Sequence, residues 1–168
     1  MGVRFIKNWV IPIISAIVVA MLINKFLIFR VEVPTGSMEP TINVGDKFLA
    51  TKIYNFDNIK RGDILVFYNE ECEKTMIKRV IGLPGDKINI NGNSLYVNGE
   101  KLEEDYVKYP QETFASYEVP EGKYFFLGDN RANSADSRYW VNPYIDEKDI
   151  EGKTQIRIAP IKNFGSLN

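Results

Sequence analysis

The chain has 168 residues, with 21 lysines and arginines, 22 aspartates and glutamates, and no histidine. Because imidazole is missing, a Ser-His-Asp triad and a zinc site that needs histidine are both excluded. Residues 31–168 carry a net charge of −5, which is atypical of a nucleic-acid-binding domain, so we expect no nucleic-acid partner.

The first predicted element is a membrane helix. Residues Trp9 to Ile23 contain no charged side chain, and the apolar run Phe26 to Phe29 follows Asn24 and Lys25. A helix rises about 1.5 Å per residue, so residues 9–29 would reach roughly 30 Å, the thickness of the bilayer hydrocarbon core. No small-x-small cleavage site follows the apolar core, which argues against a signal peptide that is removed. We therefore expect a retained transmembrane anchor over residues 9–29.

Charge predicts the orientation of this anchor. Arg4 and Lys7 precede the helix, and positive charge favours the cytoplasmic side of a membrane. We expect residues 1–8 in the cytoplasm and residues 9–29 in the cell membrane, in contact with lipid. Residues 30–168 are then a single extracytoplasmic domain of ordinary size.

The remaining residues predict a mainly β domain. Short runs of β-branched and aromatic residues alternate with turn signals, and no long helical period follows residue 31. Asn91-Gly92-Asn93 separates two such runs and is a strong hairpin signal. Residues 103–119 are expected to form a longer surface excursion. Frequent short strands favour a barrel or coiled sheet, with strands expected at residues 47–50, 64–68, 75–83, 87–90, 94–97, 124–127 and 154–159.

A serine lies shortly after the anchor, in the sequence Pro34-Thr35-Gly36-Ser37-Met38-Glu39-Pro40-Thr41. A serine beside a glycine is usually a turn residue. As a nucleophile, Ser37 would need a base other than histidine, and lysine fills that role in serine–lysine pairs. Gly36 would let a substrate backbone approach the hydroxyl, and Thr35 places a second hydroxyl nearby.

Lys78 lies in the apolar strand pattern Met76-Ile77-Lys78-Arg79-Val80-Ile81. Its side chain can point to solvent, which is usual for lysine, or inward, where desolvation lowers the pKa of the amine. Only the inward position yields a neutral amine near pH 7 that can accept a proton from serine. Arg79 would face the opposite way on a strand, so only one residue of the pair can point inward. The sequence leaves both choices open.

The third constellation is the segment Gly128-Asp129-Asn130-Arg131-Ala132-Asn133-Ser134-Ala135-Asp136-Ser137-Arg138. Such a run of turn-forming residues is ordinarily a polar surface loop. Asp129, Ser134, Asp136 and Arg138 nevertheless provide more hydrogen-bonding groups than a turn requires. An Asp–Arg pair could brace a site, and a hydroxyl could orient a lysine amine.

With these motifs the chain resembles the bacterial type I signal peptidases, membrane-bound serine proteases that remove signal peptides from exported proteins. Five blocks carry the resemblance in the order of that family: the anchor, PTGSMEPT, RGDILVF, KRVIGLPGD and GDNRANSADSR. They are spread over nearly the whole chain. The resemblance implies a catalytic domain with a coiled β-sheet or barrel, preceded by one N-terminal transmembrane helix.

The resemblance also implies a role for each matching residue. Ser37 would be the nucleophile, Lys78 the general base and Ser134 the hydroxyl that orients the lysine amine. Thr35 would share the oxyanion hole with the backbone N–H of Ser37. Met38 would lie near the substrate groove and the membrane surface. Three further matches would support the geometry of the site: Asp129, Asp136 and Arg138.

No metal or organic cofactor is implied by the resemblance. The implied partners are the signal peptides of exported preproteins, with small residues, often alanine, at the first and third positions before the cut. One segment departs from the family pattern. The family usually has a glycine soon after the Arg-Tyr-Trp that ends the last block, whereas Trp140 is followed by Val141-Asn142-Pro143.

Two other functions stay open. A self-cleaving repressor of the DNA-damage response shares the serine–lysine chemistry, but it needs a DNA-binding or partner segment where this chain has its anchor. A non-catalytic, membrane-tethered β module that binds exported peptides would not need Ser37, Lys78 and Ser134 together. Peptide cleavage that rises with pH would distinguish an enzyme with a lysine base from such a binding module.

Overall fold

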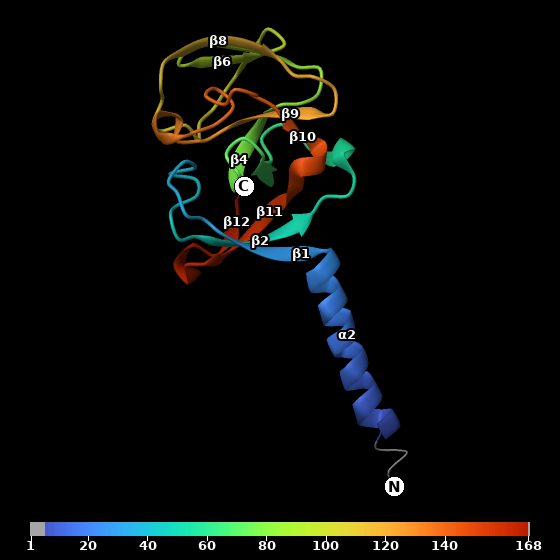
Figure 1. Cartoon of the computed structure of the whole chain (residues 1–168). Helices are drawn as coiled ribbons and strands as arrows, with labels where there is room; N and C mark the ends of the chain where they lie inside the picture. The colour runs from blue at the N-terminus through green and yellow to red at the C-terminus, as the bar shows by residue number, and fades with distance from the viewer. Residues whose placement is uncertain (1–5, 168) are drawn as a thin grey trace.

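The computed structural model describes residues 6–167, in which an N-terminal helix leads into a β-rich domain (Figure 1). The helix begins with one π-helical turn, η1 (Ile6–Val10), and continues as α2 (Ile11–Phe26). Pro12 lies in the first turn of α2, where its missing N–H costs little. Together η1 and α2 form an apolar helix of 21 residues, and none of these residues is buried against the domain. This length suits a bilayer.

The helix ends three residues earlier than the sequence predicts. Leu27 caps it, and Ile28 and Phe29 begin the first strand, β1 (Ile28–Glu32). Phe29 packs against buried residues of the domain, and the Leu27 carbonyl accepts a hydrogen bond from the Lys52 N–H. Tertiary contacts therefore outweigh the local apolar pattern. At the other end, residues 1–5 of the expected cytoplasmic segment lie outside the described residues, and residues 6–8 are helical.

The larger sheet pairs its strands in the order β1-β2-β11-β3-β4-β9-β10, and β12 pairs with β11. All of these pairs are antiparallel. Besides β1, its strands are β2 (Lys47–Lys52), β3 (Ile64–Asn69), β4 (Lys74–Gly82), β9 (Lys123–Leu127), β10 (Ile145–Asp146), β11 (Ile150–Ala159) and β12 (Gly165–Ser166). Five of the predicted strands are confirmed here, with shifted ends. The sequence patterns did not predict β1, β10 and β12.

A second sheet stands at the end of the domain that lies away from the helix (Figure 1). Its order is β7-β6-β5-β8. The predicted hairpin is confirmed, and the strands are β5 (Lys87–Gly92), β6 (Ser94–Val97), β7 (Glu100–Leu102) and β8 (Thr113–Glu118). β8 corrects the expected surface excursion over residues 103–119. It pairs along the whole of β5, and Tyr117 packs against the buried core between the sheets.

Both faces of the larger sheet are buried. Along β3, Leu65 and Phe67 belong to one apolar cluster, whereas Ile64 and Val66 belong to another on the opposite face. A third cluster joins the two sheets, through residues such as Phe125 from the larger sheet. Four 3₁₀ turns lie in the connections: η2 (Phe56–Asn58), η3 (Arg131–Asn133), η4 (Glu147–Asp149) and η5 (Ile161–Asn163). The prediction of a mainly β domain behind one apolar helix is confirmed.

Candidate active site

Ser37 lies in a turn that the core holds in place. The next residue, Met38, is 1% exposed, and its carbonyl accepts a hydrogen bond of 2.9 Å from the Ile42 N–H. The turn is also tied to the segment that follows β9. The Asn130 N–H donates to the Ser37 carbonyl over 3.1 Å, and the Asn130 side-chain amide donates to the Gly36 carbonyl over 3.1 Å. Two segments that are distant in sequence therefore fix the serine.

Lys78 on β4 meets Ser37 directly. Its Nζ lies 2.5 Å from the Ser37 Oγ, and the two residues are only 4% and 7% exposed. The Thr35 Oγ1 lies 3.5 Å from the same Ser37 oxygen. The structure thus brings a buried hydroxyl, a buried amine and the hydroxyl of the exposed Thr35 together, from two segments 41 residues apart.

Burial changes the protonation of this amine. Desolvation lowers the pKa of Lys78 from 10.5 to about 8, although the negative charges of Asp136 and Asp129 act to raise it. A lysine with this pKa is partly neutral near neutral pH and can accept the proton of a bound serine hydroxyl. The sequence left open whether Lys78 or Arg79 points inward, and the structure places Lys78 inward at Ser37.

Arg79 faces the other way but does not reach open solvent. Its side chain is 11% exposed and holds Asp129 through two hydrogen bonds, of 2.9 Å from Nε and 2.6 Å from Nη2. Its Nη1 also donates to the Gly62 carbonyl over 2.8 Å. Asp129 accepts a further hydrogen bond of 2.6 Å from the Thr41 hydroxyl. The carboxylate therefore accepts three hydrogen bonds, and its negative charge favours the protonated form of Lys78.

A second acid–base pair braces the same segment. Asp136 and Arg138 are 0% and 2% exposed at their side chains, and they form two hydrogen bonds of 2.8 and 3.0 Å. Asp136 also accepts the Gly128 N–H over 3.0 Å, and Arg138 donates to the Arg131 carbonyl over 2.8 Å. Such a buried pair with satisfied donors and acceptors fixes the backbone on both sides of Ser134.

Ser134 lies close to Ser37 without a hydrogen bond of its own. It is 7% exposed, and its hydroxyl has no hydrogen-bond partner among the residues that the structure describes. Gly128 separates the two serines. A Cβ added to Gly128 would overlap the Ser134 side chain and lie 2.5 Å from the Ser37 carbonyl oxygen. Glycine is thus required where the two segments approach each other.

A groove of about 440 Å³ opens over Ser37 and Lys78. One strand edge borders it, because β9 pairs with β4 only from Arg79 onward. On the other side residues 33–36 follow β1, and the backbone of Val33 is already paired: its N–H donates to the Asp46 carbonyl, and its carbonyl accepts from the Gly45 N–H. The residues that line the groove are Glu32, Val33, Pro34, Thr35, Gly36, Ser37, Met38, Lys74, Thr75, Met76, Ile77, Lys78, Asn133 and Ala135. Ser37 and Lys78 therefore line a groove in which one wall presents the unpaired edge of β4.

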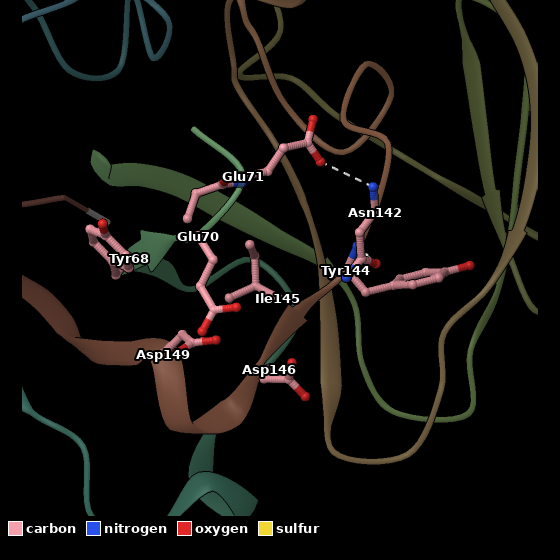
Figure 2. A pocket seen from close by; sticks show the side chains of 9 residues that line it. Tyr68, Glu70, Glu71, Asn142, Tyr144, Ile145, Asp146 and Asp149 are labelled. Atoms are coloured by element: carbon pink, nitrogen blue, oxygen red, sulfur yellow. Dashed lines mark hydrogen bonds between the residues drawn. The ribbon is translucent and has the colours of Figure 1, made fainter. Parts of the chain in front are cut away.

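The segment after Trp140 is held on a different face. Figure 2 shows a second hollow, where the Glu71 carboxylate accepts a hydrogen bond of 3.1 Å from the backbone N–H of Asn142. The same carboxylate accepts a hydrogen bond of 3.0 Å from the Val141 N–H. Trp140 itself is buried against Phe67, with ring centroids 6.1 Å apart. The described lining of this hollow shares no residue with the groove. The departure from the family pattern is therefore remote from Ser37 and Lys78.

Two contributors to the site escaped the sequence analysis. Asn130 ties the serine turn to the last block, and Thr41 hydrogen-bonds Asp129. Both residues lie inside the quoted motifs, but asparagine and threonine in turns ordinarily bond to their own local backbone. Their partners are 94 and 88 residues away in the sequence, so no local pattern marks them.

The chain is similar to known signal peptidases in sequence and in structure. The family model "Signal peptidase, peptidase S26" matches residues 6–159. A signal peptidase I of Bacillus licheniformis is 37% identical over 94% of this chain and 90% of its own length. A signal peptidase I of Leptolyngbya laminosa is 36% identical over 90% of this chain and 79% of its own. The crystal structure of a signal peptidase I from Enterococcus faecalis V583 is 35% identical, with a TM-score of 0.51 over 57% of this chain and 96% of that one.

Proposed function

The chain belongs to the signal peptidase family, peptidase S26, and on that premise we propose that Ser37 and Lys78 are the nucleophile and general base of its reaction. The protein is a type I signal peptidase, a membrane-anchored serine endopeptidase that acts on exported preproteins. One observation carries the proposed roles: the buried Lys78 amine lies 2.5 Å from the Ser37 hydroxyl. This is the distance at which a general base can take the proton of a nucleophile.

The reaction then runs in two halves. Neutral Lys78 takes the proton of Ser37 as Oγ attacks the carbonyl carbon of the scissile peptide bond. The protonated amine gives this proton to the leaving nitrogen, and an acyl-enzyme ester remains on Ser37. Water then hydrolyses the ester, with Lys78 again accepting a proton.

We assign the stabilisation of the oxyanion to two hydrogen-bond donors, the backbone N–H of Ser37 and the hydroxyl of Thr35. The Thr35 Oγ1 lies 3.5 Å from the Ser37 Oγ, close enough to donate to an oxygen bonded to the attacked carbon. Removing one such donor typically lowers the rate by about 10²–10³. Thr35 is therefore the side chain from which we expect the largest effect after the serine and the lysine.

Ser134 is assigned the role of orienting the lysine amine. Its hydroxyl is buried beside Ser37 and lacks a partner among the described residues, a situation that costs free energy. Hydrogen bonding to the Lys78 amine, once the amine leaves Ser37, would remove that cost. Asp136 and Arg138 support this arrangement by fixing the backbone around Ser134, and Asp129 supports it through Arg79.

The substrate is proposed to bind as an extended strand in the groove. The unpaired edge of β4 over residues 74–78 offers backbone donors and acceptors to a peptide laid along it. Signal peptides with small residues, often alanine, at the first and third positions before the cut suit such a channel. Met38 contributes to its wall.

The orientation in the membrane is also a proposal. We place the N-terminus in the cytoplasm and residues 30–168 outside, because Arg4 and Lys7 flank the helix on its N-terminal side. Contact with lipid is supported by the apolar surface of α2, and by Ile161 and Phe164, which are 86% and 66% exposed. Accessibility labelling of single cysteines at positions 7 and 162 in intact cells would test this orientation.

Cleavage of a preprotein with an Ala-x-Ala site tests the proposed roles. The wild type in detergent should cut after the second alanine, and Ser37→Ala and Lys78→Met should not, although both stay folded. Lys60→Met, which changes an exposed lysine outside the groove, is the matched control and should keep full activity. Activity in Ser37→Ala would mean that the nucleophile lies elsewhere. A wild type that binds the substrate without cutting it would favour the non-catalytic binding module.

A further inference from the structure

The segment of residues 103–112 carries two partly buried polar residues toward the active site. It connects β7 to β8 at the smaller sheet, where an exposed loop would suffice. Instead, the Glu104 side chain is 9% exposed and binds Arg131 through hydrogen bonds of 3.0 and 2.5 Å. The Tyr106 hydroxyl donates to the same carboxylate over 2.7 Å. The segment is thus fastened to the block that holds Ser134.

The ring of Tyr106 covers Arg79. The guanidinium carbon of Arg79 lies 4.0 Å from the centroid of the ring, a close cation–π contact. The ring therefore packs on the arginine that neighbours Lys78 and holds Asp129 with two hydrogen bonds. With Tyr106 in place, the Arg79 side chain is only 11% exposed.

Two carboxylates, Asp136 and Asp129, favour the protonated form of Lys78, and each is paired with an arginine. Asp136 is paired with Arg138, whose side chain is 2% exposed and bonds the carboxylate directly. Asp129 is paired with Arg79, which has the Tyr106 ring against it. Loosening Arg79 would leave the charge of Asp129 less compensated beside the lysine amine.

We infer that Tyr106 is a positioning residue of the active site: its ring, fastened through Glu104, holds the Arg79 guanidinium on Asp129 and so keeps that charge compensated beside Lys78. This inference rests on the proposed role of Lys78 as the general base. Tyr106 acts through Arg79 and touches neither the nucleophile nor the groove. A role limited to stability would alter the melting temperature of the protein without changing the pH at which the amine becomes neutral.

The test is the pH profile of kcat/KM for Tyr106→Leu in the full chain in detergent. The substrate is a blocked peptide with an Ala-x-Ala site and no group that titrates between pH 6 and 10. A less compensated Asp129 stabilises the ammonium form, so the acidic limb of the profile should move to higher pH, by roughly 0.5 to 1 unit. Activity at pH 7 should then fall about 3- to 10-fold and recover as the pH rises.

Two variants serve as controls. Tyr106→Phe keeps a ring on Arg79 but loses the hydroxyl that fastens it to Glu104, so its acidic limb should move less than that of Tyr106→Leu. Tyr109→Leu removes a ring from the same segment that is 49% exposed, and it should leave the profile unchanged. If Tyr106→Leu does not fold, Tyr106→Met replaces it, because methionine fills more of the vacated volume without providing a ring.

An acidic limb of Tyr106→Leu that coincides with the wild type would overturn the inference, whatever the melting temperature. So would failure of both Tyr106→Leu and Tyr106→Met to fold, because the ring would then act in folding. Failure of the proposed function would look different. In that case, Ser37→Ala would retain activity, or the wild type would show no acidic limb at all.

Discussion

Replacing Lys78 by methionine should abolish cleavage and at the same time stabilise the protein at pH 7. The amine is 4% exposed, and its pKa is lowered from 10.5 to about 8 because burial penalises the ammonium. Each pKa unit corresponds to about 1.36 kcal/mol, so the lysine destabilises the native state at pH 7 by about 3 kcal/mol. Methionine has a similar length and no charge to desolvate.

The net gain is smaller because the variant also loses the hydrogen bond to Ser37. That loss costs about 1 kcal/mol, which leaves a gain of about 2 kcal/mol and a rise in melting temperature of about 4–8 °C. Thermal unfolding in detergent, followed by the fluorescence of the buried Trp140, measures the difference. Lys60→Met is the control for removing an exposed lysine.

The pH dependence of this difference isolates the amine. Between pH values of about 8 and 10.5 the unfolded chain keeps the Lys78 proton, whereas the native state has lost it. The free energy of unfolding of the wild type therefore rises with pH in this window relative to the variant. The advantage of methionine should be full below pH 8 and vanish at about pH 9.8. Above about pH 10.5 the variant should be the less stable protein by about 1 kcal/mol, because only the lost hydrogen bond to Ser37 remains. A variant that melts below the wild type at pH 7, or a difference that stays constant across the window, would refute a desolvated lysine at this position.

Substitutions at two further positions probe the geometry around the nucleophile. Gly128→Ala should lower kcat by at least tenfold and destabilise the fold by about 1–3 kcal/mol, because the new Cβ would lie 2.5 Å from the Ser37 carbonyl oxygen. Wild-type kinetics and melting temperature in this variant would contradict the prediction, because they would show that the Ser37 turn and the Gly128 segment can move apart without cost. Thr35→Val should lower kcat by about 10²–10³ with little change in KM, whereas Thr35→Ser should retain most of the rate. Equal activity of Thr35→Val and Thr35→Ser would show that the Thr35 hydroxyl does not stabilise the oxyanion.

The local patterns of the sequence predicted the presence of most strands, but they did not predict what depends on packing against the rest of the domain. Alternation and turn residues predicted the hairpin of β5 and β6 and five strands of the larger sheet, because these signals depend only on adjacent residues. The same reasoning extended the anchor too far. Ile28 and Phe29 are as apolar as the helix before them, and only their packing on the domain makes them part of β1.

For the candidate site, the sequence by itself limited the chemistry: in a chain without histidine, a nucleophilic serine needs another base, and Ser37 in a glycine turn with Lys78 in an apolar strand predicts a serine–lysine pair. The tertiary structure alone decided which residue of the pair Lys78 and Arg79 faces the serine. Alternation along a strand says that neighbours point opposite ways, but the face that is buried at the site depends on segments packed from elsewhere in the chain. The same holds for the partner of Asp129, which lies 50 residues from Arg79, and for Tyr106, whose ring reaches that arginine only once the two sheets are assembled.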